Sequence, residues 1–200
     1  MDKTCGWDNN KLLTESGLVK LKALRNFSIL QLVTISIVAA LGIATKPIIV
    51  PLVHIITGPL FIPGGAIAGG FYMFWVVLGI GIVKRKGTGT LIGLIQGLLV
   101  IVTGAMGTHG ILSIVSYTLP GLAADLVFIW SRENKYSIIH FILGSLCANV
   151  VGTIISNAMF FRLPMETLLV LLTGAALSGA IGGVLAWNIF LGINMLNIDF

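Results

Sequence analysis

Long apolar runs constrain the fold of this chain more than any other feature. Hydrophobic residues make up 56% of the sequence and charged residues only 10%, and the mean hydropathy is +1.04. A soluble domain carries about a quarter charged residues, and it has too little interior to bury so much apolar surface. Each run is about 20 residues long, which is the length an α-helix needs to cross a bilayer. The sequence therefore predicts an all-α integral membrane protein.

Six such runs predict a bundle of six transmembrane helices. Their expected ranges are 27–44, 66–83, 88–104, 110–130, 137–161 and 166–191. The preceding residues 1–26 are polar and mixed in charge, with leucines at helical spacing beside basic residues. This pattern predicts an amphipathic helix on the membrane surface. We therefore expect a cytoplasmic N-terminal segment at 1–26 and a membrane domain at 27–200.

Proline and glycine interrupt the chain after the first run. Pro47, Pro51, Pro59 and Pro63 all fall within residues 46–65. Proline inside a helix removes a backbone hydrogen bond and kinks or breaks the helix. These residues predict a re-entrant-like loop facing outward, at membrane depth, where protein or water must satisfy its backbone.

Basic residues fix the expected orientation. Ten of the 12 Lys and Arg residues precede the first run or follow the second and fourth runs. The ten are Lys3, Lys11, Lys20, Lys22, Arg25, Lys84, Arg85, Lys86, Arg132 and Lys135. Positive residues flanking membrane spans stay in the cytoplasm. Both termini are therefore expected there, with Lys46 and Arg162 on the outer side.

Several classes of activity find no support. The sequence lacks the phosphate-binding G-x-x-x-x-G-K-[ST] motif, the zinc motif H-E-x-x-H and the nucleophile motif G-x-S-x-G. Asp125 is the one acid that falls clearly inside a span. Its carboxylate either anchors a neighbouring helix or partner, or reaches the membrane interface. We expect no enzyme, no cofactor and no metal site.

Two sets of polar residues predict a ligand cavity. Asn149, Thr153 and Asn157 recur every four residues in the fifth span, and so share one helix face. His109, Ser113 and Tyr117 repeat this spacing at the start of the fourth span, also in the expected outer half. Polar side chains in lipid face protein or water. These residues either line a ligand site or form hydrogen bonds between helices.

Three further residues are candidates for ligand contact. His54 lies in the expected loop, where a lid would belong, and Phe61 in the same loop could stack on an aromatic ligand. Gln96 is in the middle of the third span, where it either reaches the cavity floor or bonds across helices. Trp130 and Trp187 are expected near the cytoplasmic interface, as tryptophans of an aromatic belt.

Small residues recur every four positions in three spans. The first has Ala40 and Ala44, the second has Gly65 and Gly69, and the sixth has Gly174, Ser178 and Gly182. This spacing lets helix backbones approach closely. The approach is either internal packing or, for Ala40 and Ala44, a surface for a partner protein.

Several of these motifs together resemble a known family. They are the Ala40–Ala44 pair, GPLFIPGGAIAGGFYMFWVV at 58–77, VKRKGTGTL at 83–91 and LPGLAADLVF at 119–128, whose Asp125 matches an acid in the family. Over about residues 28–190 the chain resembles the S component, the substrate-binding subunit, of energy-coupling factor (ECF) transporters, of the YkoE type for thiamine or hydroxymethylpyrimidine.

The resemblance implies a vitamin-binding bundle of six helices in a bacterial or archaeal plasma membrane. Its pocket would open outward under the loop that follows the first helix. Ala40 and Ala44 would dock onto a transmembrane T component, and two cytosolic ATPases would power uptake. The family has acids in its third helix, where this chain has Gln96 among apolar residues. This departure argues against a cationic thiazolium ligand, and a neutral pyrimidine or another flat, weakly charged micronutrient fits the expected pocket equally well.

Two other functions remain open. One is a stand-alone secondary transporter of a small solute, although such proteins usually show acids or broken helices in both halves. The other is a membrane scaffold with no transport function.

Overall fold

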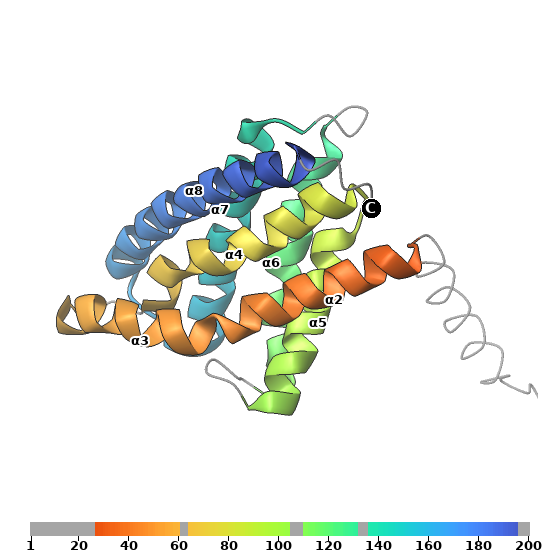
Figure 1. The fold of residues 1–200 in the computed structure, drawn as a ribbon. Helices are drawn as coiled ribbons and strands as arrows, with labels where there is room; N and C mark the ends of the chain where they lie inside the picture. The colour runs from red at the N-terminus through yellow and green to blue at the C-terminus, as the bar shows by residue number, and fades with distance from the viewer. Residues whose placement is uncertain (1–26, 61–63, 105–109, 132–135, 196–200) are drawn as a thin grey trace, which may run out of the picture.

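The computed structural model describes residues 27–60, 64–104, 110–131 and 136–195, which are almost entirely helical (Figure 1). The helices are α2 (Ile29–Ala44), α3 (Lys46–Thr57), α4 (Gly64–Val83), α5 (Thr88–Thr103), α6 (Leu112–Ile129), α7 (Ile138–Ser156) and α8 (Met165–Met195). A short 3₁₀ turn, Gly58–Leu60, follows α3, and a π-helical turn, Asn157–Phe161, extends α7. The amphipathic helix expected within 1–26 lies outside the described residues.

Five segments of the described chain are long and apolar enough to cross a membrane. They are Ile29–Thr57, Gly64–Val83, Leu112–Ile129, Ile138–Phe161 and Met165–Met195. Helix α5 is apolar but has only 16 residues, which corresponds to about 24 Å. The protein is therefore an all-α membrane protein, and its described residues form six apolar helical segments, with α2 and α3 counted as one, at positions close to those predicted.

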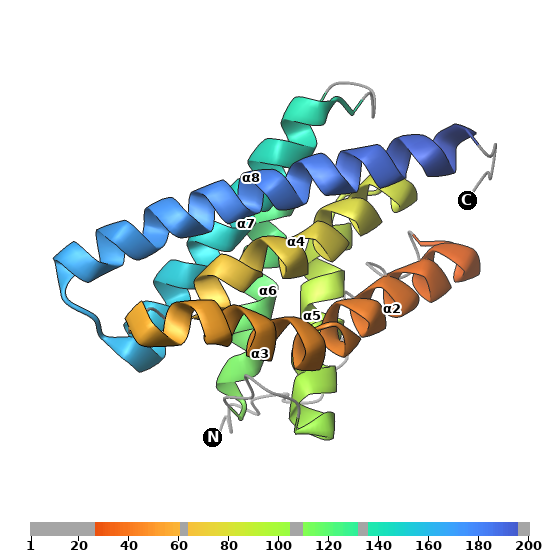
Figure 2. The same ribbon diagram turned by 60° about the vertical axis from the view of Figure 1, so that its left-hand side comes forward.

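Residues 46–57 differ from the prediction, because they form helix α3 and not a loop. Pro47 lies in the first turn of α3, where its missing N–H would have no helical partner in any case. Pro51 removes one hydrogen bond inside the helix, which the structure tolerates. The helix is interrupted at Thr45, which ends α2 and begins α3, and α3 then extends beyond the end of α2 (Figures 1 and 2).

Helix α4 lies in the middle of the bundle, against α2, α3, α5, α7 and α8 (Figures 1 and 2). Glycines bring its backbone close to its neighbours. A methyl group added at Gly70 would overlap the carbonyl oxygen of Ser178 on α8, and one added at Gly182 would overlap the carbonyl oxygen of Gly70. The α4–α8 contact is therefore a backbone-to-backbone approach of the kind that small residues permit.

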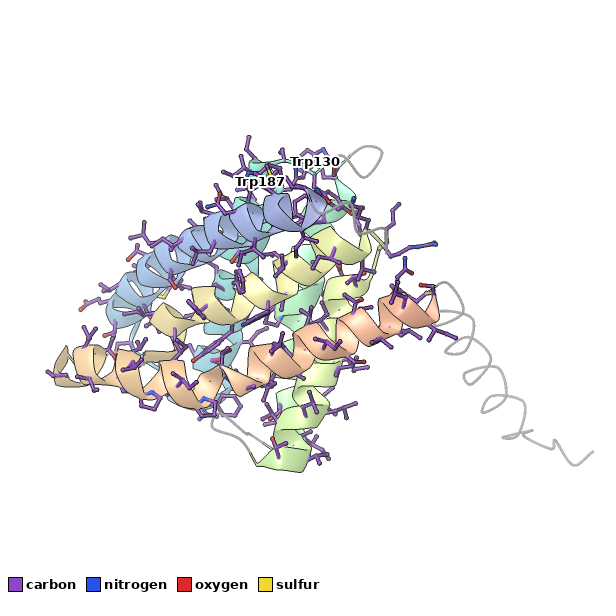
Figure 3. All side chains as sticks on the ribbon, in the orientation of Figure 1. Trp130 and Trp187 are labelled. Atoms are coloured by element: carbon purple, nitrogen blue, oxygen red, sulfur yellow. The ribbon has the colours of Figure 1, made fainter. Side chains whose placement is uncertain are left out.

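The start of α2 and the end of α8 lie at the same end of the bundle (Figures 1 and 2), as an even number of crossings requires. Trp130, which is fully on the surface, and Trp187 lie toward that end as well (Figure 3). The side of the membrane that this end faces stays a prediction.

Candidate ligand site

Lys46 occupies the break between α2 and α3, and its side chain lies inside the bundle. Only 8% of the residue is exposed. Its Nζ donates a hydrogen bond to the hydroxyl oxygen of Tyr117 on α6. The same Nζ lies 4.0 Å from the ring centroid of Tyr117 and 4.9 Å from that of Tyr72 on α4. Both distances are in the range of a cation–π interaction, so two rings from different helices surround one amine.

Two further residues, Gln96 and Trp75, lie beside Gly42, one helical turn before Lys46. Gly42 precedes Lys46 by four residues, and a methyl group added there would overlap Nε2 of Gln96 and lie 3.5 Å from Cβ of Trp75. Gln96 is buried in α5, and Trp75 is half-buried in α4. We name Lys46, Tyr72, Trp75, Gln96 and Tyr117 the Lys46 cluster. It joins the α2–α3 break to α4, α5 and α6.

Two buried groups of this cluster that are able to donate a hydrogen bond lack an acceptor among the described residues. The hydroxyl of Tyr72 and Nε1 of Trp75 are buried, and neither has a hydrogen-bond partner within the described part of the chain. The great majority of buried polar groups in proteins are paired. The cluster therefore contains polar atoms that the described protein groups leave without an acceptor.

Among the described residues, no carboxylate forms an ion pair with Lys46. The described residues include two acids, Asp125 on α6 and Glu166 on α8, and neither forms an ion pair with Lys46. Asp125 follows Tyr117 by eight residues, which is about 12 Å along the helix. Glu166 is exposed at the start of α8. An amine buried without a counter-ion is costly in an apolar interior.

Asp125 has a structural role that accounts for its position. Its Oδ1 accepts from the Gly89 N–H at 2.9 Å, and its Oδ2 accepts from the N–H and the hydroxyl of Thr90, both at 2.7 Å. These donors belong to the first turn of α5, where backbone N–H groups have no helical partner. The carboxylate thus caps α5 from α6, as the neighbouring-helix alternative for Asp125 predicts. Nearby, burial raises the pKa of Tyr136, with a further contribution from the charge of Asp125.

The polar face predicted on α7 is engaged in structural hydrogen bonds. Asn149 Nδ2 donates to the carbonyl oxygens of Ala66 on α4, at 3.0 Å, and of Ala175 on α8, at 2.7 Å. The Thr153 hydroxyl donates to the carbonyl of Asn149 within α7. Asn157 Oδ1 accepts from the Leu163 N–H at 2.9 Å, in the turn toward α8. The two bonds of Asn149 are those of the interhelical alternative, whereas the bonds of Thr153 and Asn157 are local; ligand contact by the three residues stays a prediction.

The remaining predicted residues fall in different places. Tyr117 and Gln96 are brought together in the Lys46 cluster, and Ser113 is fully buried one turn before Tyr117. His54 is exposed on α3, on the turn that packs over Gly64. Phe61 and His109 lie outside the described residues.

Sequence reasoning missed Lys46, Tyr72 and Trp75 as a group. Lys46 did stand apart in the sequence, because it is distant from the ten basic residues that fix the expected orientation. A lone ionisable residue at a break in a transmembrane run is a sign of function. Its partners were not readable, because Tyr117 lies 71 residues further along the chain.

Ala40 and Ala44 lie on the outer surface of α2. Val33, Ile37 and Leu41 are also exposed on this helix, so the two alanines belong to an apolar surface that does not pack inside the bundle. Their role as docking residues stays a prediction.

These observations define a class of protein, namely a multi-pass helical membrane protein with a buried cationic and aromatic cluster. Comparison with a solved structure gives the same architecture. A protein described as an S-component of an ECF transporter superimposes with a TM-score of 0.72 and 19% sequence identity, over 86% of this chain and 88% of that chain. The chain thus has the S-component fold.

Residues 29–151 match the family described as the ABC-type cobalt transport system, permease component. The match spans more than half of the chain, which therefore belongs to this family of transport components and not to a family of enzymes. A search of curated protein sequences gives no match. Among the described residues, no group of three or more His, Cys, Asp or Glu side chains is arranged to hold a metal ion.

Proposed function

We propose that this chain is the substrate-capturing S component of an ECF-type importer for a vitamin or vitamin precursor. The observation that carries the proposal is the Lys46 cluster, in which Tyr72 and Tyr117 surround the buried amine of Lys46 and Trp75 and Gln96 lie beside Gly42, one helical turn away. Ligand sites in proteins are usually concave, mainly apolar and fitted with a few convergent polar groups. The cluster has this composition, with Lys46, Gln96 and the two tyrosine hydroxyls as its polar groups.

The proposed partners are a transmembrane T component and two cytosolic ATPase subunits. The exposed apolar surface of α2 around Ala40 and Ala44 supports docking, because small side chains let another helix approach closely. The sequence has no phosphate-binding motif for ATP, so the energy for uptake would come from the ATPases.

The substrate class is narrowed by charge. The sequence resemblance favours thiamine or hydroxymethylpyrimidine. Because Lys46 lies within the cluster, a cationic ligand such as thiamine would be repelled there, whereas a neutral pyrimidine or a ligand with acceptor groups would not.

Purification of the tagged full chain from its native membrane in mild detergent tests this function. We expect a complex with a T component and two ATPase subunits, and ATP-dependent uptake of a solute by liposomes that contain the complex. Ala44→Trp should abolish the complex, while Gly192→Trp should leave it intact, because Gly192 near the end of α8 has no neighbouring atom within 4 Å.

The outcomes separate the alternatives. Concentration of a solute by the purified chain alone, without ATPases, would identify a secondary transporter. A chain that binds no solute and assembles with no ATPase would fit a scaffold and contradict the proposal.

A further inference from the structure

We propose that the Lys46 cluster binds a carboxylate-bearing ligand, with the carboxylate paired to the Lys46 ammonium. This inference rests on the proposed function, since it names the class of substrate that the same site takes. It goes beyond the resemblance, which points to thiamine or a neutral pyrimidine.

The inventory of donors and acceptors is the first argument. The ammonium of Lys46 has three N–H donors, and Tyr117 accepts one of them. The Tyr72 hydroxyl and Trp75 Nε1 are buried donors without a partner in the described chain, and an indole N–H is able only to donate. An ionised carboxylate only accepts, with about four lone-pair positions. It therefore offers an acceptor to these unpaired donors and to the ammonium, whereas a cationic group adds only further donors.

Charge is the second argument. The rings of Tyr72 and Tyr117 attract the amine, but they carry no net charge to balance it. Asp125, the acid on the same helix as Tyr117, accepts hydrogen bonds from the start of α5 with both of its oxygens. An anion that enters the cluster would complete a buried ion pair, and such pairs are strong when further hydrogen bonds satisfy the remaining lone pairs.

Matched pairs of aromatic acids and amides test this inference directly. Nicotinate and nicotinamide have the same ring and nearly the same size, and they differ in charge; benzoate and benzamide form a second pair. The full chain in neutral detergent is heated with each compound at millimolar concentration, with thiamine as the cationic probe. We expect the acids to raise the unfolding temperature and the amides and thiamine to leave it unchanged.

Variants of Lys46 tie the effect to this residue. Lys46→Gln should weaken acid binding at least tenfold, which corresponds to about 1.4 kcal/mol, while Lys46→Arg should keep the preference for acids. Lys84→Gln is the matched control, because Lys84 also lies near an aromatic ring, 5.8 Å from the centroid of Phe190, but is exposed. It should bind the acids as the parent chain does.

Three results would overturn the inference. The first is equal or stronger stabilisation by the amides or thiamine. The second is no acid-selective shift with any pair. The third is a Lys46-dependent shift produced equally by phosphatidylglycerol in nanodiscs, which would assign the site to a lipid headgroup. Assembly with the T component and ATPases is measured separately, so a neutral or cationic substrate would refute this inference and leave the proposed function standing. Acid-selective binding by a chain that never assembles with these partners would support this inference and refute the proposed function.

Discussion

Two regions of the bundle use buried polar groups in different ways. Where α4, α7 and α8 meet, Asn149 donates to two carbonyl oxygens on separate helices, and the Ser178 hydroxyl both accepts from the Gly70 N–H at 3.1 Å and donates to the carbonyl of Ile67. Where the α2–α3 break meets α4 and α6, the Lys46 cluster leaves donors without partners. Ser145 on α7, one turn before Asn149, also has a buried hydroxyl without a partner in the described chain.

The difference teaches how to read polar residues in apolar helices. A hydrogen bond between helices is most useful when both partners are satisfied, because an unpaired polar group costs more in an apolar interior than in water. Apart from the Ser145 hydroxyl, the region around Asn149 follows this rule and has the character of a structural junction. The Lys46 cluster departs from it, and such departures are expected where a protein meets a ligand. If the comparison is sound, variants of the two regions must affect different properties.

The largest effect on stability is expected at the α4–α8 contact. Gly182→Leu would place a side chain against the backbone of Gly70, and we expect a loss of about 3 kcal/mol or more, because neither backbone is able to move without separating the helices. Unfolding of the purified chain in detergent with increasing SDS, followed by circular dichroism, measures this loss. Gly192→Leu is the control on the same helix, since nothing lies within 4 Å of that glycine. Equal stability of the two variants would show that the helices are not in backbone contact.

Removal of the α5 cap should have the next largest effect. Asp125→Ala deletes three hydrogen bonds at the start of α5, and we expect a loss of about 2–3 kcal/mol, because buried N–H donors would be left unpaired. Asp125→Asn keeps an oxygen acceptor and should lose less. The same unfolding experiment measures both, with Glu166→Ala as the exposed control. Weaker ligand binding by Asp125→Asn at unchanged stability would instead place Asp125 in the ligand site.

A pair of substitutions compares the two regions directly. Asn149→Leu should destabilise the chain by about 1–2 kcal/mol, since two carbonyls lose their interhelical donor. Lys46→Met should leave the stability of the ligand-free chain unchanged or higher, because replacing a buried charge by an apolar side chain removes its desolvation cost. Ligand binding should be weakened by Lys46→Met and retained by Asn149→Leu. The comparison fails if Lys46→Met destabilises the free chain as strongly as Asn149→Leu.

The sequence predicted the helices better than it predicted their contacts. The six apolar ranges agree with the helices to within a few residues, because a bilayer requires a minimum length of apolar side chains. The prediction of a loop from the prolines was wrong at 46–57, because Pro47 lies in the first turn of α3, where a helix tolerates proline. Ser178 and Gly182 do pack against α4, as one alternative for their spacing predicted, whereas Gly174 lies in a loose contact. Gly89, Gly93 and Gly97 on α5 have the same spacing and pack closely on α6, a contact that the sequence analysis did not predict.

The sequence predicted only part of the candidate site, because a linear pattern does not show which helices come into contact. Spacing along one helix identified Tyr117, because residues four apart share a face whatever the rest of the fold does, and Gln96 stood out as a polar residue in the middle of an apolar span. Spacing cannot show which faces of different helices meet. Lys46, Tyr72 and Tyr117 are brought together by the packing of α2, α4 and α6, which no local pattern encodes. The polar face of α7 has a spacing similar to that of the α6 face, and yet its hydrogen bonds are structural.

The smallest effect is expected from the loss of one oxygen atom in the Lys46 cluster. Tyr72→Phe keeps the ring that faces Lys46 and removes only a hydroxyl that has no partner in the described chain. Because no protein hydrogen bond is lost, stability should change by less than about 0.5 kcal/mol. Ligand binding should fall several-fold if that hydroxyl donates to the bound molecule, as calorimetry would show. Tyr72→Phe should therefore separate binding from stability, whereas a structural hydroxyl would lower both together.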